Sequence, residues 1–293
     1  MLWKNNNTNQ NRLYENGGVY IPRDFEYTIL RHVLLNNISF NEFRPSPMLL
    51  LQGKKGEGKS FMTETILKEN NIVYKFISSS ALAGQREGDA VQNLFLYYNS
   101  VEMNPSAGKF TVLVIDDFHL SIAVAKGEAS YTTNADNLLS ALMNIADRKE
   151  KLKAPIILIG NDFSKVYAPL VRAGRMSVYT WEPTSEDKVE ILYTLLKRYG
   201  ADSSSCNPSN VSQLVSQFND MYISFFEQAI ENVFYQNFSE VTAYFSEKKG
   251  KVSYSDLNRK VSDVTTKNKL TLDAVTREAR LLSSNARLRK LDG

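Results

Sequence analysis

The stretch that decides the fold is Gly53-Lys54-Lys55-Gly56-Glu57-Gly58-Lys59-Ser60, a full match to the pattern G-x-x-x-x-G-K-[ST]. Its glycines let backbone N–H groups converge on phosphate oxygens, and a helix opening at Ser60 adds the positive end of its dipole. Lys59 is then placed to reach the β- and γ-phosphates of a nucleotide, and the Ser60 hydroxyl to bind Mg²⁺. The alternative is a Gly/Lys-rich surface turn, but the motif lies between an apolar run and a helical pattern, which favours a phosphate-binding loop.

Working outward from this loop, short apolar runs alternate with helical patterns. Four runs precede residue 180 and a fifth follows them closely, at 48–51, 73–77, 111–115, 156–159 and 178–181. Runs without polar alternation are typical of parallel strands that helices cover on both faces. The sequence therefore predicts an α/β fold with a five-stranded parallel sheet, followed by a small α-helical lid. Ligands of such sheets bind beyond the carboxyl ends of the strands.

Polar residues follow two further strands at the same expected edge. Asp116 and Asp117 come directly after the third run, and Asn161 follows the fourth. A Mg²⁺ ion opposite Ser60 would pair Asp116, while Asp117 would polarise the attacking water. Asn161 would hold that water or contact the γ-phosphate. Taken alone, each of these strings is also an ordinary turn signal.

Two arginines lie just before the fifth run. Arg172 and Arg175 are three residues apart near an expected helix end, so their side chains can face the same side. Arginine suits the stabilisation of charge on a transferring phosphoryl group, here on the nucleotide of a neighbouring subunit. A surface ion pair explains the same spacing equally well.

Composition excludes several other classes of protein. The chain has 293 residues and a net charge of +3, which gives no strong attraction to nucleic acid. One cysteine, Cys206, and two histidines exclude an intrachain disulfide and a typical zinc site. No apolar run approaches the roughly 20 residues that cross a membrane, and no secretory signal is present. We expect a cytoplasmic protein with a flexible polar leader at 1–18, a nucleotide-binding domain at 19–181 and a lid at 182–293.

The order of phosphate loop, Asp pair, Asn and Arg-x-Gly-Arg string is that of an AAA+ ATPase. Several strings go further and resemble Rubisco activase, particularly the cyanobacterial type. They are GKKGEGKSF at 53–61, LMNIAD at 142–147, IGNDFSKVYAPLVRAGRM at 159–176, Trp181-Glu182-Pro183, and the segment 223–226.

The resemblance implies a homo-oligomeric ring, a hexamer, that hydrolyses ATP with Mg²⁺ and remodels a protein client. For Rubisco, this remodelling would release inhibitory sugar phosphates. The resemblance implies catalytic roles for Asp117, Asn161, Arg172 and Arg175, nucleotide contacts from Gly53, Gly56, Glu57, Gly58, Lys59, Ser60 and Phe61, and metal contacts from Ser60 and Asp116. It also places pore loops at 80–84 and within 120–131.

The sequence departs from the family in its lid. The positions of two nucleotide-sensing arginines of the family hold Ile230 and Asn232 here. Two alternatives therefore stay open beside the remodelling ATPase. One is an AAA+ ATPase with another client, either a different protein complex or DNA that it loads, and the other is a scaffold that uses ATP only to assemble.

Overall fold

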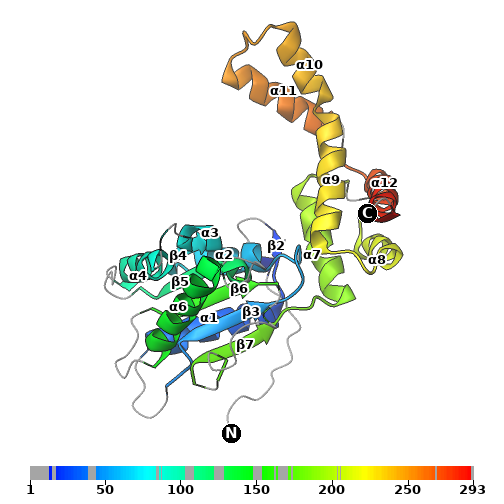
Figure 1. Ribbon diagram of the computed structural model, residues 1–293. Helices are drawn as coiled ribbons and strands as arrows, with labels where there is room; N and C mark the ends of the chain where they lie inside the picture. Colours follow the sequence, from blue (N-terminus) through cyan, green and yellow to red (C-terminus); the bar gives the residue numbers. More distant parts are fainter. Residues whose placement is uncertain are drawn as a thin grey trace. The chain divides into compact units, whose positions relative to one another are not determined.

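The computed structural model describes residues 13–14, 18–38, 44–83, 86, 88–102, 109–121, 129–147, 154–161, 163, 171–172, 174–202, 204, 206–267 and 269–291. By its contacts the chain divides into two compact units. One is Pro22–Glu182, and the other combines Pro183–Gly293 with the N-terminal segment that ends at Ile21. Each unit is described by itself below, with the labels of Figure 1.

The first unit contains the predicted five-stranded parallel sheet. Its strands run in the spatial order β4 (Val73–Ser78), β5 (Thr111–Asp116), β6 (Ile156–Gly160), β3 (Met48–Gln52) and β7 (Met176–Thr180). Every pair of neighbouring strands is parallel. All carboxyl ends therefore meet at one edge, and β3, which leads into the phosphate loop, lies between β6 and β7. The α/β prediction is confirmed.

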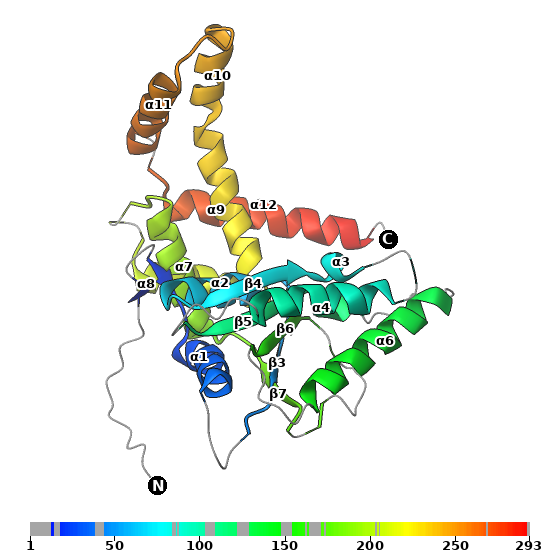
Figure 2. The same cartoon turned by 90° about the vertical axis from the view of Figure 1, so that its left-hand side faces the viewer.

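Helices cover the sheet on both faces, and the apolar side chains of its central strands are therefore buried on both sides. Met48 and Leu50 of β3 pack in one core with residues of α4 (Asp89–Glu102) and α6 (Ala129–Ala146). Leu49 and Leu51 alternate to the opposite face and are equally buried. Figure 2 shows α1 (Arg23–Asn37) and α6 on opposite sides of the strands. The remaining helices of this unit are α2 (Lys59–Glu69), α3 (Ser79–Leu82) and α5 (Phe118–Ser121).

Three local predictions need correction. The fifth strand covers Met176–Thr180 rather than 178–181, because its register with β3 ends at the pair Gln52–Thr180. The helix after the phosphate loop begins at Lys59, one residue before the expected Ser60. Within the predicted flexible leader, β1 (Leu13–Tyr14) pairs antiparallel with β2 (Val19–Tyr20), while 1–12 and 15–17 lie outside the described residues.

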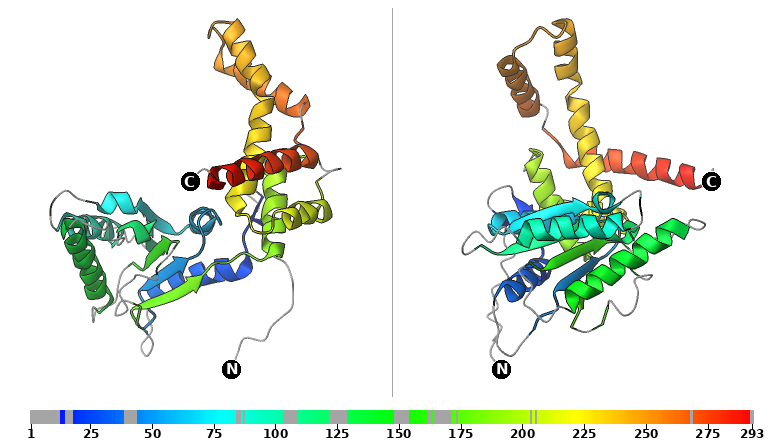
Figure 3. Two further views of the ribbon diagram at one scale, coloured as in Figure 1. Left: turned by 45° about the vertical axis from the view of Figure 1, so that its right-hand side comes forward. Right: turned by 60° about the vertical axis from the view of Figure 1, so that its left-hand side comes forward.

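The second unit is helical apart from the β1–β2 pair. Its helices are α7 (Ser185–Arg198), α8 (Pro208–Gln217), α9 (Ile223–Asn237), α10 (Ser239–Glu247), α11 (Tyr254–Lys267) and α12 (Leu272–Leu291). Thr184 begins α7 with a capping box to Asp187. Phe226 of α9 and Val275 of α12 lie in one apolar core, and Figure 3 shows these two helices crossing. No helix of the described chain has both the length and the apolar character needed to span a membrane.

Candidate phosphate-binding site

The phosphate loop leaves β3 through Gly53 and enters α2 through Gly58. Gly53 has φ of +153°, and a Cβ placed there would lie 2.3 Å from the Trp181 carbonyl oxygen. Only glycine allows the loop to pass this close to the chain that leaves β7. Gly58 precedes α2 with φ of +77°, a conformation that glycine adopts without steric cost. The first N–H groups of α2 have no helical partners and are available to an anion.

Trp181 supports the loop from the neighbouring strand. Its indole Nε1 donates to the Glu57 carbonyl over 2.7 Å, and its backbone N donates to the Gln52 carbonyl over 2.7 Å. Phe25 of α1 contacts the indole edge-to-face, with ring centroids 5.3 Å apart. The sequence placed Trp181 at the end of the fifth strand and assigned it no part in the loop, so its role in shaping the loop comes from tertiary contacts.

Lys59 is the centre of the site. Its Nζ donates to the carbonyls of Gly53 and Lys54, each over 2.7 Å, and to Asn161 Oδ1 over 3.1 Å. The residue is only 6% exposed. Burial lowers the pKa of Lys59, and the carboxylates of Asp116, Glu57 and Asp117 act in the opposite direction. The structure thus joins the loop to the end of β6, as the shared strand edge predicts.

Asp116 and Asp117 lie where β5 ends. The Asp116 side chain is half-buried, and its Oδ1 accepts the backbone N–H of Asp117 over 2.8 Å. Asp117 is exposed with φ of +52°, and its carbonyl accepts from the N–H of Leu120 over 2.8 Å. Asp117 thus occupies a strained turn that holds its carboxylate at the surface.

Asn161 makes a second contact that the sequence did not predict. Its Nδ2 lies 3.4 Å from Nε2 of His119, which follows the Asp pair in α5. Because Lys59 donates to the amide oxygen, the amide nitrogen must face the histidine, and Nε2 then acts as acceptor. The proton of a neutral His119 therefore lies on Nδ1. The only sequence signal for this residue is its position just beyond a strand end that carries site carboxylates.

His119 Nδ1 is buried and has no hydrogen-bond partner within the described residues. A Cβ at Gly160 would lie 3.0 Å from this atom and 2.4 Å from the Phe163 ring, so the end of β6 needs glycine. An unpaired buried N–H costs about 1–3 kcal/mol. Nδ1 of His119 therefore lacks a partner among the described residues in either tautomer.

The predicted arginines behave differently from Lys59. Arg175 forms a two-point ion pair with Asp147, from Nε to Oδ1 over 2.6 Å and from Nη2 to Oδ2 over 2.5 Å. Arg172 is exposed, and its carbonyl accepts the Arg175 N–H over 3.1 Å. The ion pair of Arg175 joins it to the residue that follows α6, and a trans role stays a prediction.

The donor types fit Mg²⁺, which prefers oxygen ligands and is commonly held by one or two protein groups plus phosphates and water. Ser60 in the first turn of α2 and Asp116 at the end of β5 supply a hydroxyl and a carboxylate. The described residues contain no group of three or more His, Cys, Asp or Glu that could cage a metal alone.

Other predicted residues lie at the margin of this site or outside it. Phe61 of α2 is 50% exposed, and Gly56 has φ of +78° within the loop. Ile230 is fully buried in the helical core, and Asn232 donates to Glu278 over 2.8 Å. The two positions of the family's lid arginines thus serve packing within the helical unit. Parts of both predicted pore loops, Gly84 and 122–128, lie outside the described residues.

Comparison with known proteins places this site in a family context. Residues 49–183 match the model of the ATPase family associated with various cellular activities (AAA). A ribulose bisphosphate carboxylase/oxygenase activase of Nostoc sp. (strain PCC 7120 / SAG 25.82 / UTEX 2576) is 32% identical over 220 residues, covering 71% of this chain and 52% of the relative.

Chloroplastic relatives with the same printed name match to a similar degree. The protein of Zea mays is 30% identical over 221 residues, which cover 71% of this chain and 50% of the relative. That of Cucumis sativus is 30% identical over 227 residues, covering 73% and 54%. The chain spans about half the length of the curated relatives it matches. Together with the five-stranded sheet, these matches identify the chain as an AAA+ protein that resembles Rubisco activase.

Proposed function

We propose that the AAA domain binds ATP with Mg²⁺ and hydrolyses it. The observation that carries this proposal is the Lys59 ammonium, which links two loop carbonyls to Asn161 at the end of β6. Because Lys59 already has three acceptors, a phosphate oxygen that binds it must replace at least one of them. The bond to Asn161 is the longest of the three, so we take it as the one that an arriving phosphate replaces.

Each residue then has a separate task. Lys59 neutralises charge on the β- and γ-phosphates, and the loop N–H groups bind their oxygens. Asp117, exposed at the strand end, orients the attacking water and accepts its proton. Ser60 and Asp116 would hold Mg²⁺, which supplies charge neutralisation between the phosphates.

Movement of Lys59 away from Asn161 also changes the hydrogen bond between Asn161 and His119. Once Lys59 leaves Asn161, the amide can turn its oxygen toward His119 Nε2, which then carries the proton. Nδ1 is then a buried acceptor, still without a partner among the described residues. His119 is a positioning residue in this proposal, because its Nε2 can pair with the Asn161 amide in either orientation.

The working form is a homo-oligomeric ring, a hexamer, in which Arg172 and Arg175 contact a neighbouring subunit's nucleotide. This role requires Arg175 to exchange Asp147 for phosphate, and the partial exposure of both side chains gives solvent access for that exchange. The ring remodels a protein client, and the matched activases support Rubisco as that client.

Phosphate release from Mg·ATP at concentrations that form rings tests the enzymatic part. We expect turnover in the wild type and a clear loss in Arg175→Ala, with Arg259→Ala as control because that arginine pairs with Asp256 in the helical unit. Equal turnover in the Arg175 variant and the control would contradict the trans role. Turnover without Mg²⁺ would contradict the metal assignment.

A second assay tests the client. Rubisco inhibited by a tight sugar phosphate is mixed with the protein and ATP, and carboxylation is followed over time. Recovery that depends on ATP and fails with Lys59→Ala supports Rubisco. ATP turnover without recovery for several Rubisco types would leave the ATPase intact and assign it another client.

A further inference from the structure

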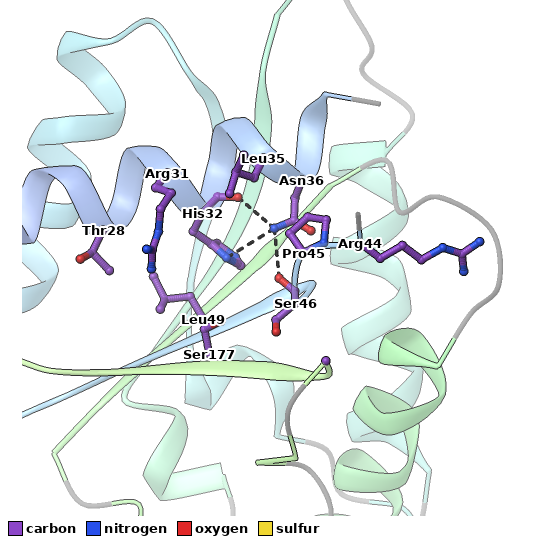
Figure 4. A pocket seen from close by; sticks show the side chains of 11 residues that line it. Thr28, Arg31, His32, Leu35, Asn36, Arg44, Pro45, Ser46, Leu49 and Ser177 are labelled. Carbon is purple, nitrogen blue, oxygen red and sulfur yellow. Dashed lines mark hydrogen bonds between the residues drawn. The ribbon is translucent and has the colours of Figure 1, made fainter. Parts of the chain in front are cut away.

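A second pocket lies at the opposite end of the sheet from the phosphate loop. Leu49 and Ser177, the second residues of β3 and β7, lie on its strand side, and α1 supplies the opposite wall (Figure 4). Its volume is about 360 Å³. This volume is at the lower end of the range for small-molecule sites. All its lining residues belong to the first unit.

The pocket has a positive charge balance. Arg31 and Arg44 line it, and the described lining residues include no Asp or Glu. Neither arginine forms an ion pair within the described part of the chain, and Arg31 contacts only the Tyr27 ring, 5.5 Å from its centroid. In Figure 4 Arg31 extends toward Leu49, whereas Arg44 points outward at the rim. Arg31 is therefore the cation best placed to meet a bound molecule.

His32 contributes a neutral ring rather than a charge. Burial lowers the pKa of His32 to about 4, and Arg31 acts in the same direction. Its Nε2–H donates to the Ile156 carbonyl over 3.1 Å, which leaves Nδ1 as an acceptor near Asn36. The positive charge of the pocket therefore comes from the arginines alone.

The pocket wall is built before any ligand arrives. Asn36 Nδ2 donates to the His32 carbonyl over 2.9 Å and to the Ser46 carbonyl over 3.0 Å, which joins α1 to the segment before β3. The Ser46 and Ser177 hydroxyls line the pocket and have no hydrogen-bond partner among the described residues. A preformed wall with free hydroxyl donors lowers the entropic cost of binding.

We propose that this pocket binds a small organic anion through a phosphate or carboxylate group. Arg31 pairs with the anionic group, since its guanidinium matches both anions with two parallel hydrogen bonds. Ser46 and Ser177 donate further hydrogen bonds, and Leu35 and Leu49 cover the carbon body of the ligand. Because β3 runs from this pocket to the phosphate loop, the two sites share one strand but no residue.

Calorimetric titration of the full chain tests the proposal with two probes, inorganic phosphate and succinate, which separate the two anion types. Phosphate can also bind the phosphate loop, so Arg31→Gln and Lys59→Ala are compared. We expect Arg31→Gln to weaken binding of the preferred probe about tenfold or more, the loss of one charge-assisted pair. Arg31→Lys should retain part of the affinity because it keeps the charge without the planar fork.

The control is Arg23→Gln, since Arg23 is exposed on the same helix and does not line the pocket. Arg23→Gln should bind the probe as the wild type does, whereas Lys59→Ala removes any binding at the phosphate loop and leaves the Arg31-dependent binding to be measured alone. Binding that Lys59→Ala abolishes while Arg31→Gln preserves it would assign the anion to the phosphate loop and overturn the proposal. Absence of saturable binding of both probes to the folded wild type would overturn it as well.

Discussion

The two ends of the sheet differ in whether their cationic side chains already have acceptors in the protein. At the carboxyl end, Lys59 donates hydrogen bonds to the carbonyls of Gly53 and Lys54 and to the side chain of Asn161. All three of its N–H groups therefore have acceptors within the chain. At the amino end, Arg31 has no carboxylate partner within the described residues, and buried His32 is neutral. A ligand at the first end must exchange existing bonds, whereas a ligand at the second end adds new ones.

This difference has a physical origin. The central strands β3, β5 and β6 are buried on both faces, so their polar residues lie where these strands begin or end. The carboxyl end is built from a glycine loop that curls back on its own lysine. At the amino end, the Arg31 side chain extends from α1 toward Leu49 of β3 (Figure 4). The first arrangement suits a switch, and the second suits a receptor for an anion.

The largest expected effect is on Lys59. Lys59→Ala should lower the rate of ATP hydrolysis by about 100-fold or more, because it removes the ammonium that links the loop to Asn161. Phosphate release under saturating Mg·ATP measures this. Lys55→Ala, an exposed lysine of the same loop, should change the rate by no more than about twofold. Similar losses in both variants would show that general loop charge, rather than the bridge, is needed.

Gly53→Ala tests the close approach at the same end. Its Cβ would meet the Trp181 carbonyl at 2.3 Å, and backbone atoms cannot yield cheaply. We expect the free energy of unfolding to fall by about 3 kcal/mol. Urea unfolding followed by tryptophan fluorescence reports directly, because Trp181 lies at the contact. Gly88→Ala also has positive φ but open space around it, so it should cost only about 1 kcal/mol.

Burial of His32 at the amino end makes the free energy of unfolding depend on pH. The folded chain holds the pKa at about 4 against an ordinary 6.5, so between these values only the unfolded chain takes up the proton. Acid therefore destabilises the fold, by about 2 kcal/mol from this residue between pH 7 and pH 5. In His32→Gln, which keeps a donor toward Ile156, the loss of stability on acidification should shrink by that amount. An unchanged pH dependence in urea unfolding would contradict the assignment.

The smallest effect is expected at an exposed hydrogen bond of the carboxyl end. Gln52 Nε2 donates to Thr180 Oγ1 over 2.8 Å in contact with solvent. Thr180→Val should change the free energy of unfolding by no more than about 0.5 kcal/mol and leave hydrolysis unaltered. A large loss of hydrolysis would mean that this pair belongs to the catalytic machinery, and the contrast between the two ends would need to include it.

Local features of the sequence were sufficient for the sheet and for the phosphate loop. A glycine-lysine loop between an apolar strand and a helix has few other solutions, and apolar runs without alternation specify strands covered on both faces. The prediction was wrong about strand boundaries that depend on the neighbouring strand. The end of β7 shifted because register with β3 set it, and Leu13–Tyr14 became a strand because Val19–Tyr20 pairs with it.

By itself, the sequence determined that a nucleotide loop, an Asp pair and an Asn would follow three of the buried strands of an α/β sheet. Only the tertiary structure decided which of these groups touch, because strand order brings Lys59 to Asn161 across 102 residues. The same strand order places His119 beside Asn161 and brings Arg175 into an ion pair with Asp147. It also forms the pocket between α1 and the strands. The reason is geometric: a motif specifies a local backbone path, whereas contacts between distant side chains exist only once the strands have chosen their neighbours.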